Sequence, residues 1–377
     1  MSPKVMPVIV LAMLASACSQ PSPTHKPPAT PTVAQAPPAP APSPPTIIAP
    51  PPAANLATDA PSDPPLPPAG QAIDAAQAPA PPGHGAYDPA LVRLEVLLDR
   101  AGFSPGVIDG RDGANLRRAV AAYAQTVSLP TTGDLEAAAL AALTAKDPTP
   151  AMQIYRVTPA DTAGPFIGPV PKDYKLMARL PALAYSSPEQ LLAEKFHMDI
   201  RLLEALNPGA EFGASGQSLL VPAPRPGPRD YRAGRIVVDK SQDEVRVFDI
   251  AGRLAAVYPA TVGSTERPAP SGVFAVRAVA KRPAYFYDPR RLTFTPEGAE
   301  GKLRIAAGPN NPVGSTWIAL TLPTYGIHGS PDPSLIGKRQ SHGCVRLTNW
   351  DAAELGLASR KGVEVDFIGH EAPPSAG

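Results

Sequence analysis

The stretch GRIVVDKSQDEVRVFDIAGRLAAVYPATVG, residues 234–263, decides the fold of the C-terminal part of the chain. It holds short β-branched runs separated by turns that contain glycine, and Val245, Val247 and Ile250 follow in near alternation. Two later segments read the same way: SGVFAVRAVA (271–280) and STWIALTL (315–322). The pattern predicts an antiparallel sheet domain from Arg232 onward. Only NWDAAELGLASRKG near its end reads as a helix, with Asn349 as a possible cap.

A different pattern occupies residues 87–147, where apolar residues recur at helical spacing in three short stretches. These residues are Leu91, Leu94 and Leu98, then Leu116, Val120, Tyr123 and Val127, then Leu140 and Leu143. Between the first two stretches, GFSPGVIDG (102–110) resembles the motif G-Y/F-x-P-G-x-I-D-G of the small three-helix peptidoglycan-binding domain. That resemblance implies a wall-binding domain, and a plain helical bundle without a ligand is the alternative.

Residues 152–224 predict a small α+β module. Ser187 fits the N-cap of one helix, and a second short helix follows Asp199. The flanking strands would be YRVT (155–158) and GQSLLVP (216–222). This order resembles LysM, a βααβ module that binds N-acetylglucosamine chains. More than twenty residues are inserted after the first strand, so sugar binding and a purely structural spacer both stay open.

The N-terminal 86 residues differ from these modules. Residues 1–17 have the layout of a secretory signal peptide, with a basic residue, a short apolar run and small residues. The small residues before Cys18 also resemble a bacterial lipobox, which implies a lipid on Cys18 and a tether to the outer membrane on the periplasmic side. Ordinary signal-peptide cleavage is the alternative. Residues 18–86 are rich in Pro and Ala and predict a disordered linker.

Charge and cysteine content narrow the possible partners and chemistry. The net charge of +1, without a dense run of Lys and Arg, argues against nucleic acid as a partner. The chain has two cysteines, and with Cys18 on the N-terminal tail Cys344 has no disulfide partner in the mature chain. An unpaired thiol in a secreted protein suggests a chemical role.

The surroundings of that thiol, YGIHGSPDPSLIGKRQSHGCVRLTNWD (325–351), bring His328 and His342 close to it in sequence. The separation of His328 and Cys344 suits a hairpin that returns the thiol beside the imidazole. Such a pair can exist as imidazolium and thiolate at neutral pH, and Gly343 would permit a turn of N–H groups around an oxyanion. The alternatives are a small buried apolar cysteine or a zinc site made by the three side chains.

Three segments of this region resemble the L,D-transpeptidase catalytic domain, the YkuD family. They are VGSTERPAPSGVFAV (262–276), GPNNPVGSTWIAL (308–320) and HGSPDPSLIGKRQSHGCVRLTNWDAAEL (328–355). The resemblance spans residues 232–369 and implies a mainly-β, β-sandwich-like domain. It also implies that Cys344 is the nucleophile, that His328 is the base, and that the Gly329 carbonyl orients the imidazole.

The same resemblance suggests roles for the neighbouring residues. Arg346 would hold a substrate carboxylate or support the oxyanion, with a surface salt bridge as the alternative. Ser341 and His342 would shape the loop that also contains Gly343, and His342 could equally take part in proton transfer.

The sequence therefore predicts a multidomain periplasmic enzyme that acts on peptidoglycan stem peptides without a metal or organic cofactor. It would release D-Ala from a stem tetrapeptide through a cysteine thioester and form 3,3 cross-links. Three alternatives stay open: hydrolysis of the same thioester, its use to attach a protein to the wall, and a wall-binding lipoprotein without catalytic activity.

Overall fold

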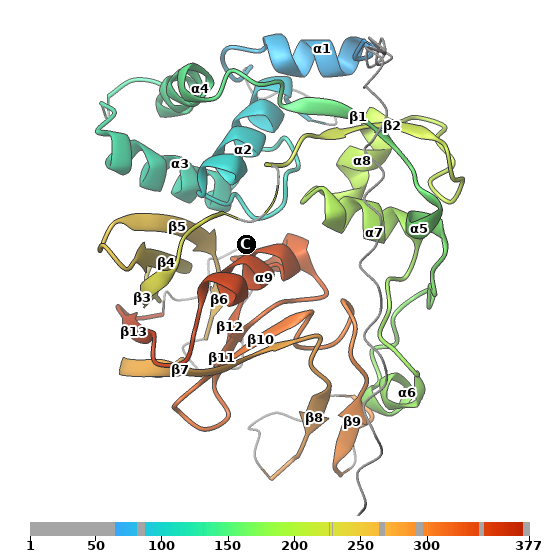
Figure 1. Ribbon diagram of the computed structural model, residues 1–377, viewed down its shortest axis with the longest axis vertical. Helices are drawn as coiled ribbons and strands as arrows, with labels where there is room; N and C mark the ends of the chain where they lie inside the picture. The colour runs from blue at the N-terminus through green and yellow to red at the C-terminus, as the bar shows by residue number, and fades with distance from the viewer. Residues whose placement is uncertain are drawn as a thin grey trace, which may run out of the picture. The chain divides into compact units, whose positions relative to one another are not determined.

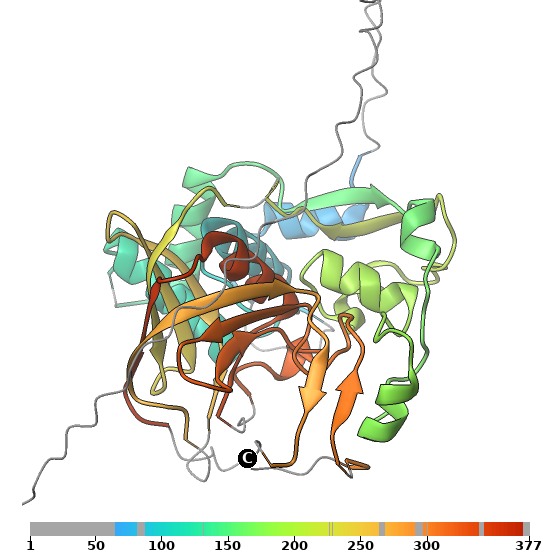
Figure 2. The same cartoon turned by 60° about the horizontal axis from the view of Figure 1, so that its bottom comes forward.

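The computed structural model describes residues 65–80, 87–130, 132–225, 227, 229–263, 268–290, 297–299, 301–338 and 343–371. Cys18, Ser341 and His342 therefore lie outside the described residues, as does the predicted signal peptide. Figures 1 and 2 show the helical modules on one side of the C-terminal sheet domain. No helix in the described ranges is both long enough and apolar enough to cross a membrane.

The three helices predicted within residues 87–147 are present. They are α2 (Pro89–Ala101), α3 (Ala114–Val127) and α4 (Leu135–Lys146). Asp88 and Asp134 start α2 and α4, because their side-chain oxygens accept hydrogen bonds from N–H groups in the first turn. The predicted apolar faces are buried except at Val127, which is 40% exposed. Val127 is the last residue of α3 and Ser128 turns into the left-handed region, so the helix ends before Val127 can reach the core.

One helix lies where a disordered linker was predicted. Helix α1 (Pro68–Ala75) packs against α2, and its Ile73 is completely buried. The Asp74 carboxylate accepts hydrogen bonds from the N–H groups of Ala151 (2.7 Å) and Met152 (3.2 Å). The prediction of a linker over residues 18–86 is therefore wrong for this segment. The average composition of residues 18–86 does not show the few apolar residues of this segment. Packing of these residues against α2 stabilises a helix that would not be stable as an isolated segment.

The α+β module contains the predicted strand, two helices and strand, but its first strand begins at Met152 and ends at Arg156, and two further helices, which were not predicted, lie in the inserted segment. Strands β1 (Met152–Arg156) and β2 (Ser218–Pro222) pair antiparallel, and the helices between them are α5 (Pro159–Thr162), α6 (Tyr174–Arg179), α7 (Pro188–Lys195) and α8 (Ile200–Leu206). Ser187 accepts a hydrogen bond from the Gln190 N–H and so caps α7, as predicted. Helix α6 belongs to the inserted segment and packs against β9 of the C-terminal domain, beside β8 (Figure 2).

The C-terminal domain is mainly β, as predicted. Its nine-stranded sheet has the order β5-β4-β3-β13-β7-β10-β11-β12-β6. The bounds are β3 (Ala233–Asp239), β4 (Glu244–Asp249), β5 (Leu254–Pro259), β6 (Thr261–Val262), β7 (Gly272–Lys281), β10 (Thr316–Leu320), β11 (Gly326–His328), β12 (Val345–Arg346) and β13 (Glu364–Ile368). Strands β8 (Tyr285–Tyr287) and β9 (Leu303–Ile305) form a separate pair, and a 3-10 turn, η1, spans Pro333–Leu335.

An antiparallel sheet was predicted, but this sheet is mixed, because β13 runs parallel to β3 and β12 runs parallel to β11. Strand β7 connects the two halves of the sheet. Its first part pairs with β13 and its second part with β10, so the apolar faces of both halves contribute to one core. Helix α9 (Asn349–Ala358) packs on β7, β10 and β11 and contributes Ala352 and Leu355 to that core (Figure 1). Thr348, not Asn349, caps α9 by accepting from the Asp351 N–H. The Asn349 side chain is thereby free for another role.

The modules are packed together through backbone and side-chain contacts. Phe103 bridges to Val257 of β5, and Ile108 bridges to Met198 of the α+β module. The Ser104 hydroxyl donates to Asp351 of α9 at 3.0 Å, and both side chains are buried. The apolar clusters of neighbouring modules are therefore continuous, since Val92 and Ile108 join the cluster of the α+β module and Val257 joins that of the three helices.

Candidate active site

The candidate nucleophile and base come from two neighbouring strands. His328 ends β11, and Cys344 directly precedes β12. The two strands are parallel, with His328 opposite Arg346. A hairpin was predicted, but parallel strands need a long crossover, and the intervening segment with η1 provides it.

This register brings the end of β11 beside the start of β12, and Cys344 lies in a bend just before β12. The Gly326 N–H, at the start of β11, donates a hydrogen bond to the Cys344 thiol, so the thiol lies against the strand that ends at His328. Strand spacing and rise put the Cα atoms of His328 and Cys344 roughly 8 Å apart, within reach of two converging side chains.

The imidazole of His328 is buried and held in one orientation. Its Nδ1 lies 2.7 Å from the Gly329 carbonyl oxygen, and its ring stacks on Trp317 with the ring centres 5.4 Å apart. A carbonyl can only accept, so Nδ1 carries the hydrogen and Nε2 has a free lone pair. Burial, together with the Arg346 charge, lowers the pKa of His328 to about 3. The ring is therefore neutral at pH 7 and able to accept a proton at Nε2.

The thiol of Cys344 is half-buried. Burial raises its pKa, opposed by a backbone hydrogen bond from Gly326 and by the Arg346 charge. Together the two shifts favour a neutral thiol beside a neutral imidazole in the substrate-free chain. The sequence suggested an imidazolium–thiolate pair, but spacing carries no information about how completely both groups are removed from water.

Gly343 precedes the thiol with a φ of 110°, a backbone conformation that L-residues with a Cβ rarely adopt. The turn before the nucleophile therefore depends on glycine at this position. The predicted contributions of Ser341 and His342 stay predictions, because both residues lie outside the described ranges.

Arg346 lies close to both reacting groups, since its charge affects the pKa of each. It forms no ion pair with another described residue, and its Nε is buried without a hydrogen-bond partner among them. Among the residues that the structure describes, Arg346 thus has no partner for the surface salt bridge considered from the sequence. A buried guanidinium group with an unused donor can bind a substrate carboxylate or carbonyl oxygen.

The sequence reasoning missed Asn349, which supports the catalytic loop. Its Oδ1 accepts from the Ser315 N–H at 2.9 Å, and its Nδ2 donates to Glu194 at 3.0 and 3.2 Å. A Cβ on Gly329 would lie 2.3 Å from Asn349 Oδ1, so only glycine fits there. The side chain lies directly behind the residue that orients His328. Its position in the resemblance motif was the available signal.

Glu194 is the second support that the sequence did not indicate. It belongs to α7, in the upstream module, and also accepts from the Tyr185 hydroxyl at 3.2 Å. Burial raises its pKa to about 7. Nothing in the local sequence of α7 shows that it contacts a loop more than one hundred residues away.

Within the described part of the chain, no three His, Cys, Asp or Glu side chains are close enough together to hold a metal ion. His342, one of the three residues considered for zinc, is outside that part. His197, which lies between α7 and α8, pairs with Asp99 at 3.1 Å and stacks on Trp350.

Comparisons with known proteins agree with two of the sequence resemblances. The family model of the L,D-transpeptidase catalytic domain, YkuD, matches residues 233–364, and that of the peptidoglycan binding domain matches residues 87–143. YkuD of Bacillus licheniformis, named as an L,D-transpeptidase, is 30% identical over 179 residues, which cover 47% of this chain and 90% of that protein. YkuD of Bacillus subtilis is 27% identical over 176 residues, 46% of this chain and 89% of the relative.

Solved structures of L,D-transpeptidases are also similar to part of the chain. One from Mycobacterium smegmatis is 22% identical and covers 41% of this chain and 64% of its own, with a TM-score of 0.30. L,D-transpeptidase 1 from Mycobacterium tuberculosis is 19% identical, with coverage of 42% and 68% and a TM-score of 0.27. This chain thus spans about two-thirds of the length of each.

Proposed function

Because the chain belongs to the L,D-transpeptidase (YkuD) family, we propose that Cys344 forms a thioester with a peptidoglycan stem tetrapeptide and releases its terminal D-Ala. The observation that carries the proposal is the parallel pairing of β11, which ends at His328, with β12, which directly follows Cys344. The hydrogen bond from Nδ1 to Gly329 leaves Nε2 as the proton acceptor.

In the acylation step, Sγ attacks the carbonyl that precedes D-Ala while Nε2 of His328 takes the thiol proton. Neutral groups suit this concerted transfer, since the thiol need not be ionised beforehand. The C–N bond then breaks, and the imidazolium returns the proton to the amine of D-Ala. The Arg346 guanidinium would bind the substrate carboxylate or the oxyanion.

In the second step, the amine of the third residue of another stem attacks the thioester. A new amide bond forms, the C–S bond breaks, and the amine proton reaches the sulfur through His328. The product is a 3,3 cross-link. Attack by water or by a protein lysine would give hydrolysis or protein attachment from the same thioester. No metal or organic cofactor takes part in these steps.

The remaining parts of the chain suit work at the cell wall. The peptidoglycan binding domain would hold the enzyme on its substrate, and the α+β module, if it binds glycan as LysM does, would add to this. Residues 1–17 would direct export to the periplasm, and a lipid on Cys18 would tether the chain to the outer membrane.

The test is incubation of the purified full chain with disaccharide-tetrapeptide, followed by mass analysis of products and protein. We expect a cross-linked dimer that lacks one D-Ala, and a carbapenem adduct on the protein. Cys344→Ala should abolish both while its circular dichroism spectrum and melting temperature match the wild type. Full activity of Cys344→Ala would refute the assignment, and a folded wild-type chain that never becomes acylated would favour a wall-binding protein without catalytic activity.

A further inference from the structure

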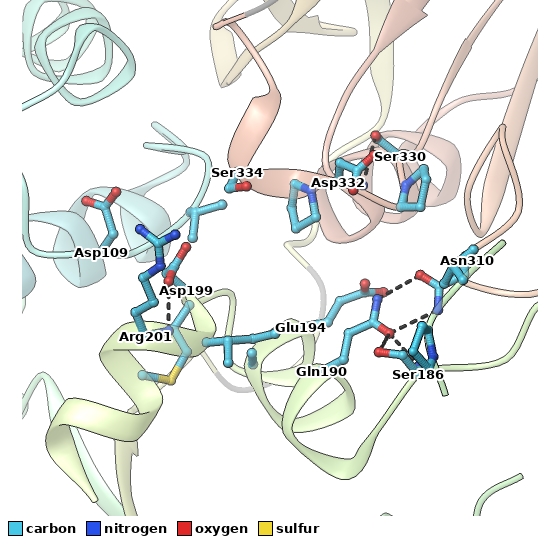
Figure 3. A pocket seen from close by; sticks show the side chains of 18 of the residues that line it. Asp109, Ser186, Gln190, Glu194, Asp199, Arg201, Asn310, Ser330, Asp332 and Ser334 are labelled. Atoms are coloured by element: carbon cyan, nitrogen blue, oxygen red, sulfur yellow. Dashed lines mark hydrogen bonds between the residues drawn. The ribbon is translucent and has the colours of Figure 1, made fainter. Parts of the chain in front are cut away.

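A groove of about 1080 Å³ lies where the three modules meet. The loop after α2 contributes Asp109 and Arg111, helix α8 contributes Arg201, and the loop around η1 contributes Asp332 and Lys338. Figure 3 shows Asp109, Asp199 and Arg201 on one side, and Ser186, Gln190 and Asn310 on the other. Small-molecule pockets usually measure about 300–1,000 Å³, so this groove can hold more than the two residues around a scissile bond.

The groove reaches Arg346, whereas His328 and Cys344 are not among the residues that line it. Arg346 belongs to the lining, and its charge influences the pKa values of both His328 and Cys344. Ser330, two residues after His328, and Tyr174, from the inserted segment, also line it. A ligand in the groove therefore lies next to the candidate catalytic centre.

The floor of the groove is preformed, because helix α7 is fixed to the catalytic domain at two points. Gln190 and Asn310 exchange hydrogen bonds of 2.7 and 2.9 Å between their side-chain amides, and Glu194 accepts from Asn349. The two α7 residues are four positions apart and thus face the same way. A preformed polar site avoids the entropic cost of ordering its walls when a ligand binds.

The charges in the groove are mixed. Its charged lining residues are Asp109, Glu194, Asp199, Glu204 and Asp332 on the acidic side, and Arg111, Lys172, Arg201, Lys338 and Arg346 on the basic side. Arg201 and Lys338 are exposed and form no ion pair with another residue of the described ranges. These two cations beside several carboxylates complement a ligand that carries both carboxylates and an ammonium group. An uncharged sugar chain would have no use for them.

We propose that this groove binds the second stem peptide, the one whose side-chain amine resolves the thioester. The inference rests on the proposed function and deepens it, because it names a site for the acceptor and favours cross-linking over hydrolysis. The basic side chains would hold the acceptor's carboxylates, and its amine, after losing one proton, would approach the thioester past Arg346. The C–S bond breaks as the C–N bond forms, and the sulfur regains a proton through His328.

The experiment separates the two half-reactions. Acylation is measured as the release of D-Ala from a donor tetrapeptide. Aminolysis is measured as the rate at which the thioester is converted to cross-linked product at increasing concentrations of a synthetic stem tripeptide with a free side-chain amine. The variants are Arg201→Glu and Lys338→Glu, neither of which belongs to the reacting groups. Arg156→Glu is the matched control, since Arg156 is an exposed residue of the same module as Arg201 but lies outside the groove.

We expect Arg201→Glu and Lys338→Glu to raise the tripeptide concentration needed for half-maximal aminolysis by roughly tenfold, with acylation and the control unchanged. Hydrolysis should take a correspondingly larger share of the thioester. An unchanged tripeptide dependence in both variants would overturn the proposal, as would an equal loss in acylation.

Binding of the same tripeptide to Cys344→Ala, measured by calorimetry, provides a readout that needs no turnover. If the double variant Cys344→Ala, Arg201→Glu binds the tripeptide more weakly than Cys344→Ala, the proposed acceptor site is supported even when the wild-type chain forms no cross-link. Equal binding by the two variants overturns the proposal. A wild-type chain that binds the tripeptide in the groove but never releases D-Ala would refute the proposed function alone.

Discussion

The protonation state of the His328 imidazole, the candidate base, predicts how the rate of acylation depends on pH. An imidazole with the ordinary pKa of about 6.5 is roughly 97% protonated at pH 5, so a reaction that needs it as a base slows about 30-fold between pH 7.5 and pH 5. Burial and the Arg346 charge lower the pKa of His328 to about 3. At pH 5 about 99% of this imidazole is still neutral, so the acylation rate should hardly fall between pH 7.5 and pH 5.

The assay is the second-order rate of acylation of the full chain by a carbapenem, followed by intact-protein mass spectrometry from pH 5 to pH 8. We expect the protonation of His328 to change the acylation rate constant by less than about twofold between pH 5 and pH 8. Circular dichroism at each pH verifies that the chain stays folded. A fall of tenfold or more with a midpoint near pH 6.5, in folded protein, would refute the account of a buried, neutral base.

Three further predictions follow from the surroundings of the imidazole. The unfolded chain binds a proton at this histidine below about pH 6.5, whereas the folded chain does not. The free energy of unfolding of the wild type, relative to that of His328→Gln, should therefore fall by about 1–2 kcal/mol between pH 6.5 and pH 5 in urea titrations. Glu194→Ala should lower the free energy of unfolding by about 1–3 kcal/mol, because the buried Asn349 amide loses an acceptor, and Glu194→Gln should lose less. Gly329→Ala should lower the melting temperature and acylation rate, because its Cβ would overlap Asn349 at a cost of about 1–3 kcal/mol.

Each of these has a control and a contradicting outcome. If the free energy of unfolding depends on pH in the same way in the wild type and in His328→Gln, titratable groups other than His328 determine that dependence. Equal losses in Glu194→Ala and Glu194→Gln would argue against the hydrogen bond as the cause. Gly213→Ala is the control for glycine substitution, since its Cβ would only touch Pro188 at 3.8 Å, and a wild-type-like Gly329→Ala would contradict the close contact described here.

Part of the molecule could be predicted from local patterns. The three helices of residues 87–147, the two helices after Ser187 and Asp199, and the strands within residues 234–263, 271–280 and 315–322 follow from periodicity and capping residues, which act within a few positions. The short segment around His328 and Cys344 indicates the candidate chemistry because the residue types needed for a thiol nucleophile stand close together in the chain.

The sequence by itself thus determined the modules, their order and the candidate nucleophile and base. Tertiary structure alone decided that β11 and β12 run parallel, that burial keeps both reacting groups neutral, and that α1 is folded. It also decided that Glu194 supports Asn349 and that three modules line one groove. These features depend on desolvation and on contacts between segments far apart in the chain, which no local pattern of residues encodes.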